Sequence, residues 1–187
     1  MMTPSEYLKN KKVLVMGLGL LGGGIATTKW LVKHGAKVTV TDLKSRADLS
    51  SSIKALGPVA KKIKLVLGKH NESDFKNNHI IVVNPAVPKE SPFLKIARKA
   101  GASLENEATL FFNLCPSPII AVTGTRGKTT TVNWIHHFLR QKFGSAVLAG
   151  NSTEHPYLKK LDSLDPKVPV VVEISSWHLE LFDSHVK

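Results

Sequence analysis

Cysteine is almost absent from this sequence, which has one, Cys115, in 187 residues. A single cysteine excludes a disulfide framework and a zinc site built from paired cysteines. No apolar run approaches the roughly 18 residues that a membrane-spanning helix requires, so we expect no membrane partner. The first residues contain no apolar stretch before the first strand-like run, which predicts no secretory signal. These absences favour a soluble, cytoplasmic protein.

The charge is unbalanced, with 26 Lys+Arg against 14 Asp+Glu and a formal net charge of +12. Such a balance is compatible with a nucleic-acid partner, an anionic small substrate or a lysine-rich solvated surface. The lysines are scattered, without an arginine-rich stripe and interleaved aromatic residues, so we expect a solvated surface and no nucleic-acid partner. The three tryptophans, Trp30, Trp134 and Trp177, are expected in the core.

The first half of the chain predicts an α/β fold with a Rossmann-like parallel sheet. Lys12–Met16 is a short β-branched apolar run that predicts a buried strand. A glycine-rich turn and helix-compatible residues follow, and Lys37–Thr41 predicts the next strand. Strand, turn, helix and strand make one βαβ unit, which implies parallel strands with a right-handed connection. Further predicted elements are strands at Lys64–Leu67 and His79–Val83 and a helix at Pro92–Ala100.

A stiff connector, Cys115-Pro116-Ser117-Pro118, predicts a domain boundary that divides the chain into residues 1–115 and 116–187. The second part predicts a P-loop α/β ATPase domain. Only about 70 residues follow the boundary, whereas domains of this kind usually exceed about 100, so we expect an incomplete domain. Its predicted elements are strands at Ile119–Thr123, Ala146–Ala149 and Val168–Ile174 and a helix ending near Phe143.

The pattern Gly17-x-Gly19-x-x-Gly22 lies between a predicted strand and a predicted helix. Glycines let the backbone approach a phosphate, and the free N–H groups of a helix N-terminus stabilise its charge. Asp42 ends the next strand, where a Rossmann domain keeps an acid for a ribose hydroxyl. The plain interpretation is an NAD-type site. The alternative is that the glycines serve only a tight turn and close helix–strand packing.

A second glycine loop follows the predicted strand of the ATPase domain. Lys128 can reach the β- and γ-phosphate oxygens of a nucleotide, and the Thr129 hydroxyl is placed to ligate Mg²⁺. Val122 stands where the strict pattern has its first glycine, so this is a variant P-loop. Glu173 closes a later apolar run and fits the second acid of such a metal site. The candidate ATP-binding residues are Gly124, Thr125, Arg126, Gly127, Lys128, Thr129 and Thr130.

Together these residues resemble the Mur ligases. The resemblance includes both glycine loops, Asp42, the turn Asn84–Pro88, Gly150-Asn151 and the block Glu173–Glu180, which is similar to the pattern of the D-glutamate-adding members. It implies an ATP-dependent ligase of peptidoglycan precursor synthesis, with ATP and Mg²⁺ as cofactors. The implied reaction adds D-glutamate to UDP-N-acetylmuramoyl-L-alanine through an acyl phosphate.

The resemblance also changes the interpretation of the first loop, which would hold the UDP of the muramoyl substrate and not NAD. It implies that Lys128 and Glu173 are catalytic and that Thr129 and Glu173 hold the metal. Four residues, Leu21, Leu43, Arg126 and His178, depart from those common in the family. The implied substrate-binding residues are Gly19, Leu20, Leu21, Asp42, Leu43, Asn84, Pro85, Ala86, Asn151 and Ser175.

The resemblance places the D-glutamate-binding domain outside these residues, so we expect no turnover by the chain alone. Two other functions stay open. An NAD-type oxidoreductase would explain the first loop and Asp42 but leaves Lys128, Thr129 and Glu173 without a role. A non-enzymatic module could bind a UDP-sugar or nucleic acid. An incomplete parallel sheet would also expose an edge and apolar surface through which the chain could form oligomers.

Overall fold

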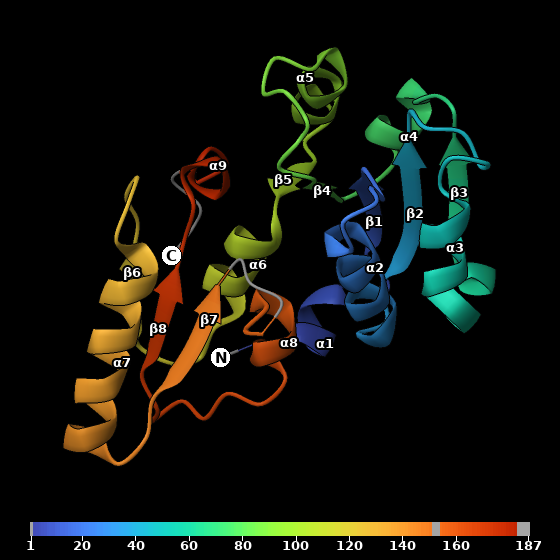
Figure 1. Ribbon diagram of the computed structural model, residues 1–187. Helices are drawn as coiled ribbons and strands as arrows, with labels where there is room; N and C mark the ends of the chain where they lie inside the picture. Colours follow the sequence, from blue (N-terminus) through green and yellow to red (C-terminus); the bar gives the residue numbers. More distant parts are fainter. Residues whose placement is uncertain (1, 151–153, 183–187) are drawn as a thin grey trace. The chain divides into compact units, whose positions relative to one another are not determined.

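A computed structural model describes residues 2–150 and 154–182, which form two compact units (Figure 1). The first unit is Thr3–Asn106, and the second begins at Glu107. The division comes before α6 (Glu107–Leu114) because this helix packs against α8 (Tyr157–Leu161) and α9 (Ser176–Leu179) of the second unit. The contacts of α6 therefore place the division one short helix earlier than the boundary that the proline-rich connector predicts.

The first unit is built on a five-stranded sheet with the order β3-β2-β1-β4-β5, in which every pair is parallel. This is the order of a Rossmann-type sheet and confirms the predicted fold class. The central strand β1 pairs Val13 with Val38 on one side and with Ile80 on the other. The strands are β1 (Lys12–Met16), β2 (Lys37–Asp42), β3 (Lys64–Leu67), β4 (Ile80–Val83) and β5 (Ser103–Glu105).

The core of this unit lies on the inner strands. Every residue of β4 and all but the first of β1 are buried, as expected for parallel strands covered on both faces. Thr3 and Glu6 form a capping box at the start of α1, which fixes where this first helix begins. The helices are α1 (Pro4–Leu8), α2 (Gly23–Lys33), α3 (Ser50–Leu56), the 3₁₀ helix η1 (Gly57–Lys62), α4 (Glu72–Lys76) and α5 (Pro92–Lys99).

The second unit holds a three-stranded parallel sheet with the order β6-β8-β7. Val170–Val172 of the central strand are fully buried. In the described part of the chain, no helix has the length and apolar character needed to cross a membrane. The remaining elements are β6 (Ile119–Val122), α7 (Lys128–Phe143), β7 (Val147–Gly150), α8 (Tyr157–Leu161), β8 (Val170–Glu173) and α9 (Ser176–Leu179).

The prediction that all three tryptophans lie in the core is wrong for two of them. Trp30 is buried, but Trp134 and Trp177 are more than half exposed. Trp134 stacks on Phe138, which is exposed as well, one turn further along α7. Val132 is the only buried residue of this helix, so most of its surface is open to solvent. Self-association through such exposed apolar side chains stays a prediction.

Close backbone packing joins α2 to the loop that precedes it. A Cβ on Gly24 would lie 2.6 Å from the carbonyl oxygen of Gly17 and would also overlap the carbonyl of Leu18. Gly24 is buried, whereas the neighbouring Gly23 is exposed. Glycine is therefore required at position 24 by the space available, since no side chain fits between the helix and the loop.

We expect Gly24→Ala to lower the free energy of unfolding by about 1–3 kcal/mol, because the added methyl group would displace backbone atoms. Urea unfolding followed by the fluorescence of the buried Trp30 measures the change. Gly23→Ala is the matched control and should keep or raise stability, since alanine favours the helix. Equal losses in both variants would contradict this account of Gly24.

Candidate functional site

The first glycine loop connects β1 to α2 at the carboxyl edge of the first sheet. Gly17, Gly19 and Gly22 have φ values of 98°, 64° and 93°, in the left-handed region that favours glycine. Gly22 is the N-cap of α2, whose first N–H groups have no partner within the helix. The strand order reverses between β1 and β4, so this loop lies where open α/β sheets bind ligands.

The Asp42 carboxylate braces this loop from the end of β2. Its Oδ2 accepts the N–H groups of Leu18 (2.9 Å) and Gly19 (3.1 Å), and its Oδ1 accepts the N–H of Lys44 (2.9 Å). Asp42 is buried, and three hydrogen bonds offset the cost of removing its carboxylate from water. A carboxylate offers about four acceptor positions, so this role is compatible with the predicted nucleotide contact, which stays a prediction.

Two further side chains hold the loop. Ser52 of α3 donates its hydroxyl to the carbonyl of Gly19 at 2.7 Å. Asn84 follows β4 and lies so close to Gly17 that a Cβ there would be 3.0 Å from the Asn84 Cβ. The Asn84 Oδ1 also accepts the N–H of Ala86 at 3.0 Å, which closes the turn after β4. The structure therefore brings the predicted loop and turn residues together and adds Ser52.

Apolar side chains at this edge of the sheet face solvent. Leu21 is fully exposed, and Leu20 and Leu43 are more than half exposed. Pro85 and Ala86, in the turn after β4, are exposed as well. All five residues follow the carboxyl ends of β1, β2 and β4, which are neighbouring strands. This places the predicted substrate-binding residues of the first unit at one edge of its sheet, and their contact with a nucleotide stays a prediction.

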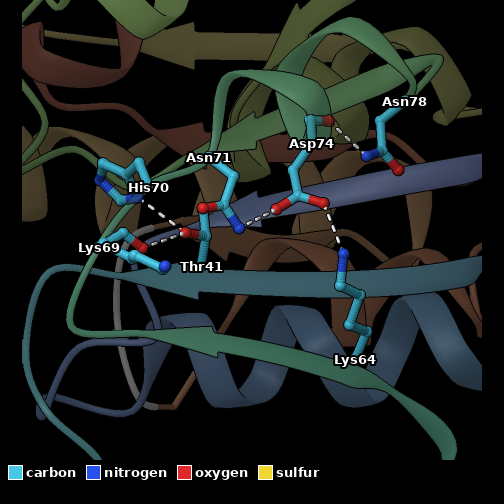
Figure 2. Close-up of polar contacts among 7 residues, drawn as sticks. All are labelled: Thr41, Lys64, Lys69, His70, Asn71, Asp74 and Asn78. Carbon is cyan, nitrogen blue, oxygen red and sulfur yellow. Dashed lines mark hydrogen bonds and ion pairs between the residues drawn. The ribbon is translucent and has the colours of Figure 1, made fainter.

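His70 is half-buried and lies beside Thr41, near the end of β2 (Figure 2). Thr41 Oγ1 donates to the carbonyl of Lys69 (3.2 Å) and lies 2.7 Å from His70 Nδ1. The rings of Phe75 and Phe93 pack edge-on against the imidazole. Burial lowers the pKa of His70, and the Asp42 charge offsets part of this effect.

The rest of the network in Figure 2 centres on the buried carboxylate of Asp74. It accepts a hydrogen bond from Lys64 Nζ at 2.7 Å and one from the Asn71 amide at 3.2 Å. The Asp74 carbonyl accepts the Asn78 amide at 2.6 Å. These bonds join β3 to α4 and so hold the segment between them, which carries His70.

The second glycine loop connects β6 to α7 and is exposed. Gly124 and Gly127 have φ values of 150° and 77°, and Gly127 is the N-cap of α7. Lys128 Nζ donates to the carbonyl of Gly124 at 2.8 Å, so the ammonium group lies back across its own loop. This arrangement combines a helix N-terminus, glycines and a lysine, which is the chemistry of a phosphate-binding loop.

Thr129 and Glu173 meet across two neighbouring strands. β6 and β8 pair in parallel with Val122 opposite Glu173, so the second loop and the end of β8 share one edge of the sheet. Thr129 Oγ1 donates to Glu173 Oε2 at 2.9 Å. The sequence predicts an acid at the end of a neighbouring strand, and the structure places Glu173 there. Its role as a metal ligand stays a prediction.

These groups fit Mg²⁺ and a nucleoside triphosphate. Mg²⁺ takes one or two oxygen ligands from the protein and the others from phosphates and water. The hydroxyl of Thr129 and the carboxylate of Glu173, 2.9 Å apart, are oxygen ligands of this kind. Within residues 2–150 and 154–182, no cluster of three His, Cys, Asp or Glu side chains could hold a metal ion.

A serine–histidine contact follows β8. Ser175 is the N-cap of α9, and its Oγ lies 2.7 Å from His178 Nδ1. His178 is buried, and burial lowers its pKa, so the neutral imidazole is favoured. Asn151, which was predicted to approach the substrate together with Ser175, lies outside the described residues.

Comparison with known families adds an independent observation. Residues 11–105 match the family described as Mur ligase MurD-like, N-terminal domain, and residues 122–180 match the Mur ligase middle domain. The chain belongs to the Mur ligase family. The two matched segments contain the two glycine loops described above, one in each compact unit.

Nearly the whole length of this chain is similar in sequence to curated Mur ligases. It is 48% identical to the UDP-N-acetylmuramoylalanine--D-glutamate ligase of Roseiflexus sp. (strain RS-1), over 92% of this chain and 36% of that protein. It is 44% identical to the protein of the same name in Borreliella afzelii (strain PKo), over 96% of this chain and 39% of that protein. The structure of a pseudomurein peptide ligase type C from Methanothermus fervidus is 29% identical in sequence to this chain. The match covers 89% of this chain and 33% of that chain, with a TM-score of 0.46. The chain spans a little over a third of the length of these curated relatives.

Sequence reasoning did not identify Ser52 and Gly24, which contact the first loop, or Tyr157, which bonds the Glu173 carbonyl. Ser52 and Tyr157 donate to backbone carbonyls distant in sequence, and such a bond leaves no local motif. Gly24 is the last of three consecutive glycines, and the sequence does not indicate which of the three packs against the loop. The run was the signal available, because consecutive glycines at a helix start suggest close backbone contact.

We expect Asp42→Asn to lower the free energy of unfolding by about 1–3 kcal/mol, because an amide cannot satisfy all three N–H groups that the carboxylate accepts. Urea unfolding followed by Trp30 fluorescence measures this loss. Asp48→Asn is the control, since it removes an equal charge from an exposed position that bonds only Ser45 in the same turn. Equal stability of Asp42→Asn and the unmodified chain would contradict the bracing role.

We expect the pH dependence of stability to be shallower in His70→Gln than in the unmodified chain. The pKa of His70 is lowered in the folded state, so the unfolded chain takes up a proton first as the pH falls. The contribution of His70 is therefore intact above its unfolded pKa of about 6.5 and is lost as the pH falls from there toward the folded pKa. Urea unfolding at pH 7.5, 6.5 and 5.5 tests this, and parallel profiles would rule out the effect.

Proposed function

We propose that this chain supplies the UDP-substrate unit and the ATP loop of a ligase that adds D-glutamate to UDP-N-acetylmuramoyl-L-alanine. The observation that carries the proposal is the contact of Thr129 with Glu173 across β6 and β8, beside Lys128. An NAD-type oxidoreductase would leave Lys128, Thr129 and Glu173 without a role. The names of the relatives from Roseiflexus and Borreliella support the choice of D-glutamate.

Each residue of the second loop has a physical role in this proposal. Lys128 exchanges its bond to the Gly124 carbonyl for phosphate oxygens, which a cation binds more strongly. Thr129 and Glu173 hold Mg²⁺ through their oxygen atoms. The N–H groups of residues 124–130 and the start of α7 stabilise phosphate charge. ATP supplies the phosphoryl group that turns the substrate carboxylate, a poor electrophile, into an acyl phosphate with a good leaving group.

The first unit binds the UDP part of the substrate in this proposal. The α2 N-terminus beside Gly19, Leu20 and Leu21 faces the diphosphate, and Asp42 and Leu43 lie on the uracil side. Asn84, Pro85 and Ala86 approach the same molecule from the turn after β4. The roles predicted for Asn151 and Ser175 toward its sugar or peptide end stay predictions. No residue of this chain is assigned to D-glutamate.

A thermal-shift titration of this chain with UDP-N-acetylmuramoyl-L-alanine, Mg·ATP and NADH tests the proposal. A ligand that binds only the folded state at a hundredfold excess over Kd should add about 2.7 kcal/mol of stability. We expect saturable shifts with the UDP-sugar and with Mg·ATP and none with NADH. A shift with NADH alone would overturn the proposal in favour of an oxidoreductase.

Matched variants separate the two sites. We expect Lys128→Gln to abolish the shift with Mg·ATP and to leave the shift with the UDP-sugar unchanged, because Lys128 belongs to the second loop only. Lys142→Gln removes an exposed lysine from the same helix and should preserve both shifts. Loss of the UDP-sugar shift in Lys128→Gln would show that the variant acts through the fold and would remove this support for the loop assignment.

A further inference from the structure

A fully buried tyrosine lies behind the metal-site carboxylate and has no part in the proposed reaction. The side chain of Tyr157, in the first turn of α8, is 0% exposed. Its hydroxyl donates to the backbone carbonyl of Glu173 at 2.7 Å. A phenol has to find a partner when it is buried, and this one finds it on the residue whose carboxylate bonds Thr129.

The hydrogen bond from Tyr157 is made to the last residue of β8, at the edge of the sheet. Glu173 is opposite Val122 of β6 and Gly150 of β7, and each is the last residue of its strand. Just after Glu173, the Ile174 N–H donates to the Val122 carbonyl at 3.0 Å, and the Tyr157 hydroxyl donates to the Glu173 carbonyl of the same peptide group. This peptide group is therefore held at both its N–H and its carbonyl.

Glycine brings β7 close to Glu173 from the side. A Cβ on Gly150 would lie 2.8 Å from the Glu173 carbonyl oxygen and 3.1 Å from the Glu173 Cβ. The chain then returns, and Pro156 forms a bridge with Gly150 just before Tyr157. Gly150 and Tyr157 thus confine the Glu173 backbone from two directions.

Aromatic packing fixes the tyrosine itself. Its ring lies 5.8 Å from that of Phe111 in α6 and 5.4 Å from that of His178, measured between centroids. A tyrosine held by rings on two sides is a rigid donor and not an adaptable one.

We propose that Tyr157 is a positioning residue, which sets the Glu173 carboxylate for Mg²⁺ by holding the Glu173 carbonyl from within the core. This inference rests on the proposed function, in which Glu173 holds the metal. It predicts that the Tyr157 hydroxyl acts on metal-dependent nucleotide binding and not on nucleotide binding in general, because Lys128 and the loop N–H groups need no metal.

The test is calorimetric titration of this chain with ATP, once in EDTA and once in saturating Mg²⁺. The ratio of the two Kd values is here named the magnesium effect. We expect Tyr157→Phe to reduce the magnesium effect by about two- to tenfold, the worth of one hydrogen bond. The Kd in EDTA should not change. Phenylalanine keeps the ring contacts, and a thermal melt of the variant checks its fold.

Two further variants make the assignment specific. Tyr7→Phe removes the hydroxyl of the other tyrosine, which lies in the first compact unit, and should leave the magnesium effect unchanged. Glu173→Gln should reduce the magnesium effect by itself. Adding Tyr157→Phe to Glu173→Gln should then have no further consequence, because the two changes act on one ligand.

Each of the three remaining outcomes would overturn the inference, and they differ in what else fails with it. If the unmodified chain shows a magnesium effect that Tyr157→Phe leaves intact, the inference fails and the proposed function stands. If Tyr157→Phe weakens ATP binding equally with and without Mg²⁺, the residue is merely structural and the inference fails. If the unmodified chain binds ATP without any magnesium effect, the role proposed for Glu173 fails and the inference fails with it.

Discussion

Backbone contact that only glycine permits is the constraint on which both loops depend. At Gly24, the helix after the first loop lies directly against the carbonyls of Gly17 and Leu18. At Gly150, a strand end lies directly against the backbone of Glu173. In the first unit this contact fixes the first glycine loop against its sheet, and in the second it fixes the end of β8, where Glu173 bonds Thr129.

Much of the fold could be predicted because its signals are local. Alternation of apolar runs and glycine turns predicts parallel strands in the first unit, which the structure confirms. The β-branched runs that begin at Lys12 and Lys37 become central strands, and the loop between them becomes the start of α2. The second loop was equally visible, since a lysine and threonine after glycine, between strand and helix, form a compact motif.

The parts that could not be predicted depend on contacts between distant residues. Nothing near Trp134 in the sequence indicates that its side of α7 faces solvent, because exposure depends on which helix face meets the sheet. The proline-rich connector suggested a boundary, but the contacts of α6 determine the unit to which it belongs. Asp42 was recognised as a candidate ligand contact, whereas its bonds to Leu18 and Gly19 became visible only in the folded chain.

The bracing of the first loop has a thermodynamic consequence for any ligand that it binds. Asp42 and Ser52 fix the loop backbone through hydrogen bonds to Leu18 and Gly19. The loop then loses little conformational entropy when an anion binds, and this smaller loss raises the affinity. Selection for tight binding at this site would consequently also act on residues that never touch the ligand, such as the serine inside α3.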